Sequence, residues 1–224
     1  MTGARLEALA RTATVRLGPE DADGTLWGSG FFVAPGWVLT CLHVVRERLG
    51  PDGGLPFAVH GAGGLRVGAR LGYRLPAAQD GDQDLALVRL LDDVPHPCVW
   101  LTDRGDKPAR VAAYGWRVPK EGQAPQEWSG NCAITGSDGP YGMMLGPETE
   151  VPHGASGGPV VDRDHGSVVG VVKARRRGRD GGLAIATTAL RGFETAEAVG
   201  GENGLGPDPY ERLIRAHDEW HDGC

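Results

Sequence analysis

Glycine and proline recur at short intervals along this chain, and no other feature limits its fold so strongly. The 224 residues include 37 Gly and 16 Pro, which is about twice their share in an average protein. The glycines come mostly singly or in pairs between short apolar runs, and hydrophobic residues make up 40% of the sequence. Because a disordered linker would lack those apolar runs, the pattern predicts many short elements joined by tight turns.

Most of the apolar runs have the features of β-strands. Segment 26–33 is predicted as a strand, Ala34-Pro35-Gly36 as a turn, and 37–45 as the returning strand of a hairpin. The other predicted strands are 12–17, 65–75, 85–91, 109–116, 126–135, 143–145, 158–161, 168–173 and 183–187. A helix is predicted over 209–220, with Pro209 in its first turn and Asp208 as a candidate N-cap.

The predicted strands lie on both sides of a proline-containing stretch at 92–108. Short strands at this spacing favour barrels, so we expect an all-β fold of two closed antiparallel barrels with about six strands each. The expected division is an N-terminal barrel at 1–95, a linker at 96–108, a C-terminal barrel at 109–206 and a C-terminal helix at 207–224. Together these parts would form one functional unit.

Charge and cysteine content limit the compartments and the classes of partner that we expect for this protein. The net charge of −6 argues against a general nucleic-acid binder. No apolar run approaches the roughly 18 residues of a membrane span, and the first residues show no secretory signal. The four cysteines show no paired spacing. We therefore expect free thiols, a reducing compartment and a cytoplasmic location, with no membrane partner.

Ser156 lies in the segment HGASGGPVVD, between glycines on both sides. A serine hydroxyl is a poor nucleophile until a base takes its proton. Glycines let the backbone turn sharply, so the N–H groups of Gly154 and Ser156 can point at one spot and bind an oxyanion there. On its own, such a segment is more often a simple turn.

His43 and Asp84 would complete the chemistry that Ser156 needs. His43 follows the apolar strand of the predicted hairpin, where a buried structural histidine is the ordinary interpretation. Asp84 directly precedes the apolar run 85–88, so it is the loop aspartate that we expect to be carried inward. A buried carboxylate needs a partner, and a histidine N–H supplies one. Together, His43, Asp84 and Ser156 form a known nucleophile, base and orienter set.

The residues around these three side chains resemble a known family. G-S-G-F-F-V, W-V-L-T-x-x-H-V-V, D-L-A-L-V-R-L and G-A-S-G-G-P-V-V occur in this order. They are similar to the motifs of the trypsin-like (chymotrypsin-fold) serine proteases, especially the short bacterial HtrA-like branch without a PDZ domain. The resemblance extends over residues 13–190, and it implies a chymotrypsin-like double barrel with the site in the cleft between the barrels.

The resemblance implies a role for each matching residue. Ser156 would attack the scissile carbonyl, His43 would take and return the proton, and Asp84 would orient the imidazole. The N–H groups of Gly154 and Ser156 would form the oxyanion hole. No metal or other cofactor is implied. Ala155 stands where the secreted digestive members carry the aspartate that pairs with their new N-terminus, so activation through that ion pair is not expected.

The specificity pocket is the least defined part of the resemblance. Glu150 holds the position about six residues before the serine, and Lys173 and Arg175 lie on the strand that would form the second wall. Glu150 would favour a basic substrate side chain. Arg175 would instead fill the pocket, pair with Glu150 or attract an acidic side chain, and the sequence leaves these alternatives open.

Two further features have a simpler interpretation. The run from Lys173 to Arg179 is rich in arginine, which suits an acidic docking partner or, more simply, a solvated loop. His217, His221 and Cys224 recur at helical spacing, but three residues at a chain end are a weak metal-site signal.

The sequence thus predicts a serine endopeptidase acting on a protein or peptide substrate through a Ser-His-Asp triad and an acyl-enzyme. Because no pro-segment is expected, we also predict latency until a regulatory partner or the substrate binds. The alternative is a catalytically latent, protease-fold binding or signalling module of a larger bacterial regulatory or defence system. It predicts a blocked cleft and partner binding that survives loss of Ser156.

Overall fold

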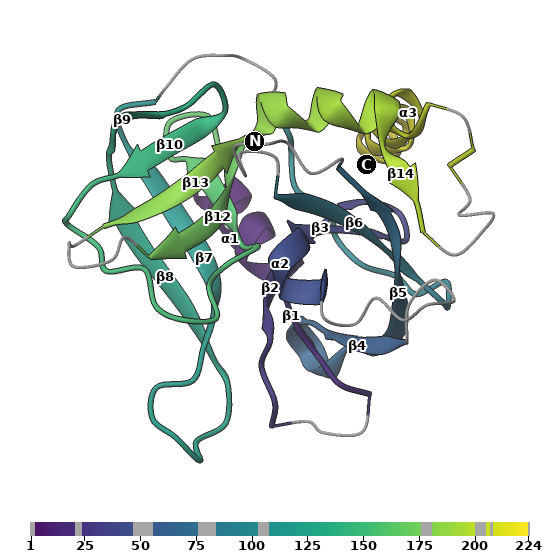
Figure 1. Ribbon diagram of the computed structural model, residues 1–224, viewed down its shortest axis with the longest axis horizontal. Helices are drawn as coiled ribbons and strands as arrows, with labels where there is room; N and C mark the ends of the chain where they lie inside the picture. The colour runs from purple at the N-terminus through teal and green to yellow at the C-terminus, as the bar shows by residue number, and fades with distance from the viewer. Residues whose placement is uncertain are drawn as a thin grey trace.

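Two antiparallel β-sheets, built mainly from the N-terminal and the C-terminal half of the chain respectively, lie side by side in this computed structural model, with helices around them (Figure 1). The structure describes residues 3–20, 24–46, 56–75, 84–102, 108–175, 181–199, 205–206 and 208–223.

The first sheet closes into a barrel. Its strand order is β14-β5-β4-β1-β2-β3-β6, and a further β5–β6 pairing joins the two ends of the six-strand part. The short strand β14 adds to the edge of β5. The strands are β1 (Thr14–Gly18), β2 (Gly28–Ala34), β3 (Trp37–Cys41), β4 (Phe57–His60), β5 (Arg66–Arg74), β6 (Leu85–Leu90) and β14 (Glu197–Ala198).

The second sheet has the order β8-β7-β11-β12-β13-β10-β9. Its outer strands β8 and β9 are separated in the chain by Ala133 alone, so one nearly continuous stretch of chain supplies both outer strands. The strands are β7 (Val111–Arg117), β8 (Gln126–Cys132), β9 (Ile134–Asp138), β10 (Gly142–Leu145), β11 (Pro159–Asp162), β12 (Val168–Arg175) and β13 (Gly182–Ala186). The predicted all-β fold with a C-terminal helix is confirmed: the first sheet is a closed six-strand barrel extended by β14, and the second is a barrel-like sheet of seven strands rather than about six.

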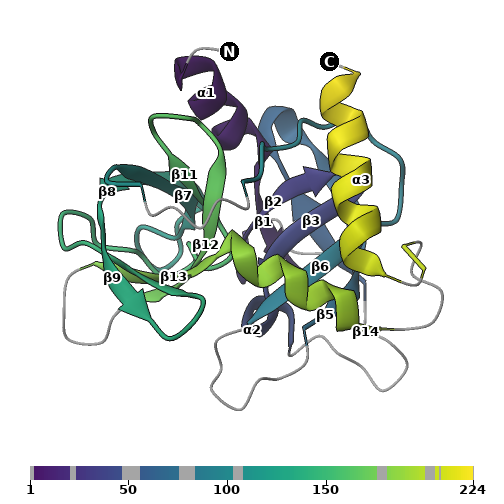
Figure 2. The same cartoon turned by 90° about the horizontal axis from the view of Figure 1, so that it is seen from above.

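Helices cover the outside of the sheets (Figure 2). They are α1 (Gly3–Ala13), α2 (Leu42–Val45), η2 (Ala62–Gly64), η3 (Thr187–Thr195) and α3 (Pro209–Asp222). Helix α3 packs against η3 and β2. The Asp208 carboxylate accepts a hydrogen bond from the Glu211 N–H (3.0 Å), and Pro209 begins the helix, so the predicted cap and helix are confirmed.

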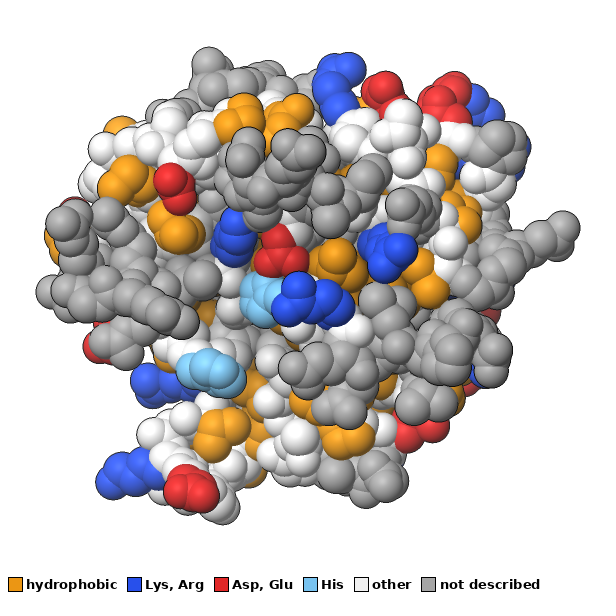
Figure 3. Space-filling model, viewed as in Figure 1, with side chains coloured by type: hydrophobic (Ala, Val, Ile, Leu, Met, Phe, Trp, Pro, Cys, Tyr) orange, Lys and Arg blue, Asp and Glu red, His pale blue; other side chains and the backbone are white. Residues whose placement is uncertain are grey.

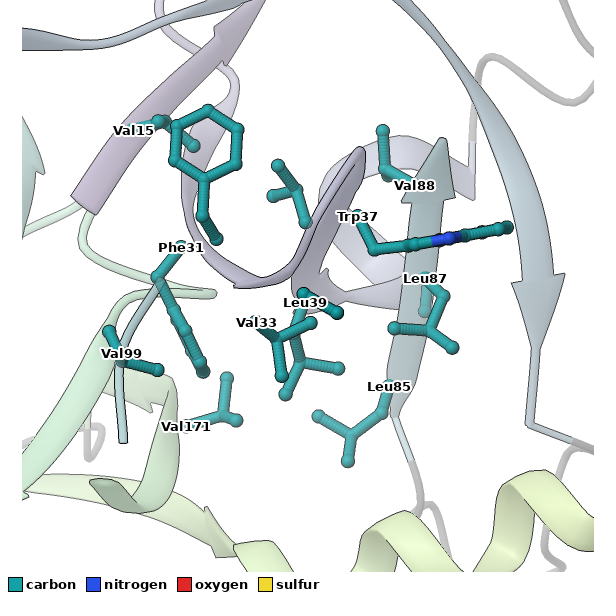
Figure 4. Close-up of a cluster of buried hydrophobic side chains, with 14 of the residues drawn as sticks. Val15, Phe31, Val33, Trp37, Leu39, Leu85, Leu87, Val88, Val99 and Val171 are labelled. Atoms are coloured by element: carbon teal, nitrogen blue, oxygen red, sulfur yellow. The ribbon is translucent and has the colours of Figure 1, made fainter. Parts of the chain in front are cut away.

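The larger of two hydrophobic core clusters of the described residues extends across both sheets. Strand β2 is buried along its whole length, and Phe31 and Phe32 are among its largest buried side chains. Figure 4 shows Phe31 close to Val99 from the linker and Val171 from β12. Because these side chains pack in one cluster, the two halves hold a fixed relative position, which a site at their junction requires.

The structure differs from the sequence-based predictions at two places in the first half of the chain. Residues 3–13 form α1, where a strand was expected from residue 12. Leu6, Ala10 and Ala13 are buried at the spacing of one helix face. The predicted strand 37–45 ends at Cys41 and continues as the single turn α2, which carries His43.

Candidate active site

His43 and Asp84 are joined by two hydrogen bonds. The His43 ring Nδ1 lies 2.5 Å from Asp84 Oδ2, and the His43 backbone N–H donates to Asp84 Oδ1 (2.9 Å). A carboxylate only accepts, so Nδ1 carries a proton in this pair. Nε2 is left as the ring atom that can take a proton from a neighbour. The side chains are 37% and 20% exposed, so the imidazole can reach a bound molecule.

Strand pairing in the first barrel brings these two residues together. Strands β3 and β6 run antiparallel, with Cys41 opposite Leu85. Asp84 immediately precedes β6, and His43 lies in the turn that follows β3. The Leu42 N–H also donates to the Asp84 carbonyl (3.1 Å). Asp80 and Asp82, the other acidic residues of this loop, lie outside the described residues.

The Ser156 loop approaches the same place from the second barrel. Gly157, the next residue, donates its N–H to the Val172 carbonyl (2.7 Å). The Cys41 thiol, two residues before His43, donates to that same carbonyl (3.2 Å). One acceptor on β12 therefore joins the Ser156 loop to the end of the strand that leads to His43. Among the described residues, no hydrogen bond joins the Ser156 hydroxyl to His43.

Figure 3 shows the face that carries this junction. Histidine, acidic and basic side chains gather near its centre. Ser156 is half-buried.

The backbone of the Ser156 loop leaves two N–H groups unused. Ala155 donates to the Pro152 carbonyl (3.3 Å), and Gly158 donates to the Ala155 carbonyl (3.0 Å). Within the described part of the chain, the N–H groups of Gly154 and Ser156 have no hydrogen-bond partner. Gly154 has φ +97° and Gly157 has φ +92°, values that favour glycine. Two such N–H groups can bind an anion or a developing oxyanion where they point at one spot.

Cys41 lies behind the His43–Asp84 pair. Its sulfur and one ligand atom each of His43 and Asp84 lie within 4.8 Å of one another, a spacing that could hold a metal ion. Burial, reinforced by the negative charge of Asp84, raises the pKa of the Cys41 thiol well above its usual range. A metal ion prefers the thiolate. We therefore interpret Cys41 as a neutral hydrogen-bond donor.

The three predicted pocket residues are only partly described. Glu150 is exposed just before the nucleophile loop. Lys173 is half-buried at an irregularity of β12, between Val172 and Ala174. Arg175 ends β12, but its side chain and residues 176–180 lie outside the described residues. The pocket and the arginine-rich run therefore stay predictions.

The histidines of the C-terminal helix have a structural role that the sequence did not reveal. His217 Nδ1 donates to the Val33 carbonyl (2.7 Å), and His221 Nε2 donates to the Val99 carbonyl (2.9 Å). The Trp100 ring stacks on His221 with centroids 3.8 Å apart. Burial lowers the pKa of both histidines. They join α3 to β2 and the linker, while Cys224 lies outside the described residues.

Two other histidines, His60 and His96, are at least partly buried. His60 is buried in β4, because Phe57–His60 pairs with β1 and β5. His96 is half-buried, stacks on Phe32 and accepts the Gly36 N–H (3.0 Å). It therefore braces the turn of the hairpin that leads to His43.

No helix of the described part of the chain is long and apolar enough to span a bilayer.

A protein-family comparison places the site in a known context. The family described as the trypsin-like peptidase domain matches residues 28–171, more than half of the chain and a span that includes His43, Asp84 and Ser156. Among curated proteins, none matches the sequence significantly.

Solved structures show the same fold at low sequence identity. A serine endoprotease from Yersinia pestis has a TM-score of 0.65 and 19% identity, covering 96% of this chain and 67% of its own. An inactive form of Rv3671c from M. tuberculosis H37Rv has a TM-score of 0.61 and 20% identity, covering 84% and 87%. The HtrA-type protease AlgW, in complex with a tripeptide, has a TM-score of 0.59 and 23% identity, covering 84% and 60%.

The family match and the shared double-barrel fold agree with the motifs around the three candidate residues. The chain belongs to the trypsin-like serine protease family, with HtrA-type proteases among its structural neighbours.

Proposed function

We propose that this protein is a serine endopeptidase that hydrolyses peptide bonds through an acyl-enzyme. Ser156 is the nucleophile, His43 the general base and acid, and Asp84 the residue that orients the imidazole. The observation that carries the proposal is the double hydrogen bond from His43 to Asp84. It fixes both the position and the tautomer of the ring, so that Nε2 can remove the Ser156 proton as Oγ attacks the carbonyl carbon.

The unpaired N–H groups of Gly154 and Ser156 support the second half of this mechanism. Attack on the carbonyl carbon moves negative charge onto the carbonyl oxygen of the substrate. Two backbone donors that already lack partners can bind this oxygen without first breaking other hydrogen bonds. His43, now protonated, gives its proton to the leaving amine. Water then repeats the sequence on the acyl-enzyme.

The edge of β12 supports binding of an extended peptide. Strand β11 pairs with β12 only as far as Val171, and the loop hydrogen bonds extend that contact to Val172. Beyond this point β12 continues to Arg175 while pairing with β13 on its other side. An extended substrate can therefore add as a strand at 173–175, next to the Ser156 loop. Glu150, Lys173 and Arg175 are the proposed determinants of side-chain preference.

Latency and a regulatory partner stay part of the proposal. The Gly154 and Ser156 N–H groups are not occupied by any described residue. A restraint on activity would therefore limit substrate access or displace His43. It would not consist of a described residue that occupies these two N–H groups. A rise in turnover when a partner or substrate analogue is added would support latency, and full turnover by the isolated protein would contradict it.

The test of the proposed function is labelling with a fluorophosphonate, which forms a covalent bond with an activated serine. With or without an added partner or substrate analogue as activator, we expect wild type to be labelled at most once per molecule, at Ser156; full labelling in at least one of these two conditions is expected, and Ser156→Ala should remain unlabelled in both. A matched control is Ser137→Ala in β9, outside the candidate site, which should be labelled like wild type. A folded wild-type protein that resists labelling, and that binds a peptide equally well as Ser156→Ala, would favour the binding-module alternative.

A further inference from the structure

Ser29 is a buried polar residue in the first barrel whose hydrogen bonds reach the nucleophile loop. It is the second residue of β2, and it is 0% exposed. Its N–H donates to the Ser156 carbonyl (2.8 Å), and its carbonyl accepts from Thr40 Oγ1 (2.6 Å). Its hydroxyl donates to the Gly154 carbonyl (2.7 Å) and accepts from the Trp116 N–H (2.8 Å). Backbone and side chain thus act together on residues of the opposite barrel.

The two carbonyls that Ser29 holds are those of the two proposed oxyanion donors. A peptide group is planar, so a bonded carbonyl also sets the direction of the N–H of the next residue. Holding the Gly154 carbonyl orients the Ala155 N–H, and holding the Ser156 carbonyl orients the Gly157 N–H. Both of these N–H groups are themselves hydrogen-bonded, so each of the two peptide planes is held on both sides.

The unpaired N–H groups lie directly beside these anchored planes. The Gly154 N–H belongs to the peptide group just before the held Gly154–Ala155 group. The Ser156 N–H belongs to the Ala155–Ser156 group, which lies between the two held groups. Their directions therefore depend on backbone angles at residues whose carbonyls Ser29 holds. Without the Ser29 hydroxyl, the buried Gly154 carbonyl would lose the hydrogen-bond donor that it has in the described structure, and rotation of that peptide would be one way to recover a partner.

Close packing around Ser29 shows how tightly the two barrels meet here. A Cβ added to Gly115 would lie 3.0 Å from Ser29 Oγ, and one added to Gly157 would lie 2.0 Å from the Ser29 carbonyl oxygen. Glycine at both positions permits the approach that the hydrogen bonds require. A larger side chain at position 29 would have no room, which makes cysteine the closest substitute in size.

We propose that Ser29 is a positioning residue for catalysis, which holds the Gly154 and Ser156 peptides so that their N–H groups converge on the substrate oxygen. This inference rests on the proposed function of the Ser156 loop. The competing interpretation is that Ser29 merely satisfies buried polar groups and contributes to stability alone. The two interpretations differ in one respect: whether loss of the hydroxyl weakens the binding of the transition state more than the binding of the substrate.

The test compares Ser29→Ala and Ser29→Cys with wild type, using a chromogenic peptide ester and a peptide boronic acid. The boronic acid forms a tetrahedral adduct with the serine and so reports the oxyanion contacts. Active-site titration with a fluorophosphonate corrects each rate for the fraction of competent protein. Thr187→Val is the matched control, because it removes a buried hydroxyl that donates to the Thr102 carbonyl, outside the Ser156 loop.

We expect Ser29→Ala to lower kcat by about 10- to 100-fold, with KM changed by less than about 3-fold. Boronic acid affinity should fall in proportion to kcat. Ser29→Cys, with its weaker S–H donor, should lie between Ser29→Ala and wild type. Thr187→Val should lose stability but retain the wild-type kcat. If the Ser29 variants lose only thermal stability while kcat and boronic acid affinity match wild type, the proposal is wrong.

A crystal structure of Ser29→Cys or Ser29→Ala separates this proposal from the proposed function. If wild type proves inactive, the proposed function fails, but the positioning role is still tested by the loop. We expect the Gly154 carbonyl to turn away from its wild-type direction. A loop that superposes on wild type in both variants overturns the positioning role, whatever the activity of the wild-type protein.

Discussion

Gly157 lies so close to Ser29 that a Cβ on Gly157 would be 2.0 Å from the Ser29 carbonyl oxygen. Gly157, the residue after the candidate nucleophile, is thus a point of close backbone contact between the second barrel and the first. Its backbone also has φ +92°, a value that residues other than glycine rarely adopt.

Gly157→Ala should therefore displace the Ser156 loop from β2. The backbone strain alone amounts to about 1–3 kcal/mol, and the clash with Ser29 adds to it. We expect a lower unfolding free energy and a loss of fluorophosphonate labelling in the protein that remains folded. Gly122→Ala is the control, since Gly122 has φ +80° but nothing within 4 Å of its added Cβ. Equal effects of the two substitutions would contradict the role of the Ser29 contact.

Asp84→Asn should reverse the tautomer of His43 with little change in shape. The Asn carbonyl can still accept the His43 backbone N–H, but its NH₂ group would face Nδ1, which must then be unprotonated. The proton moves to Nε2, and the ring can no longer act as a base toward Ser156. We expect kcat/KM to fall by about 10³- to 10⁴-fold while the melting temperature stays near that of wild type.

Asp138→Asn, at an exposed position in β9, is the control for loss of one carboxylate. Steady-state kinetics with an ester substrate would measure both variants. Retention of more than a tenth of the wild-type activity in Asp84→Asn would show that the His43–Asp84 contact does not set the tautomer used in catalysis.

Stability should fall as the pH is lowered through the range where free histidine titrates. Burial lowers the pKa of His217 and His221, and also that of His96, below the usual value. Between the folded and the unfolded pKa values, the unfolded chain binds more protons than the folded protein, so the unfolding free energy rises with pH. The stabilisation is complete above about pH 6.5, the unfolded value, and is lost as the pH falls through the folded values.

Guanidinium unfolding at several pH values between about 5 and 8 would measure this slope. His217→Gln should reduce the slope, because one of the three histidines no longer titrates. Leu213→Ala, which removes a fully buried apolar side chain of the same helix, should lower stability at every pH and leave the slope as it is. A slope that is equal in His217→Gln and wild type would assign the pH dependence to other groups.

Cys41 should resist thiol reagents until the protein unfolds. The described cysteines Cys41, Cys98 and Cys132 are free and buried, as predicted for a chain without disulfides. Burial raises the pKa of Cys41 well above its usual range and that of Cys132 to about 11, so little reactive thiolate is present at neutral pH. Peptide mapping after brief alkylation should find both unmodified in native protein and modified in guanidinium. Rapid native alkylation of Cys41 would mean that the space behind His43 opens in solution.

The hairpin before His43 could be predicted because all its signals are local. Its apolar strands, its Ala34-Pro35-Gly36 turn and its position before the histidine are visible in one segment, and the turn Gly36 has φ +74°. The same segment did not predict that the strand ends at Cys41. That ending depends on the Leu42 and His43 N–H groups finding Asp84 rather than continuing the sheet.

The sequence by itself determined the chemistry that the chain can offer. It placed a histidine, an aspartate and a glycine-flanked serine at the ends of apolar segments, in an order that matches one family. It also determined the double barrel, because alternating apolar strands and frequent turn residues act over a few neighbouring positions.

Only the tertiary structure decided what holds these groups in place. Ser29 contacts Gly154 across 125 positions of the chain, and His217 contacts Val33 across 184. Ser29 lies within the motif G-S-G-F-F-V, but no local pattern shows which groups its hydroxyl contacts, and none distinguishes His217 from a frayed terminal histidine. Their roles arise because a buried carbonyl needs a donor, and which donor meets it depends on how the two barrels and the last helix pack.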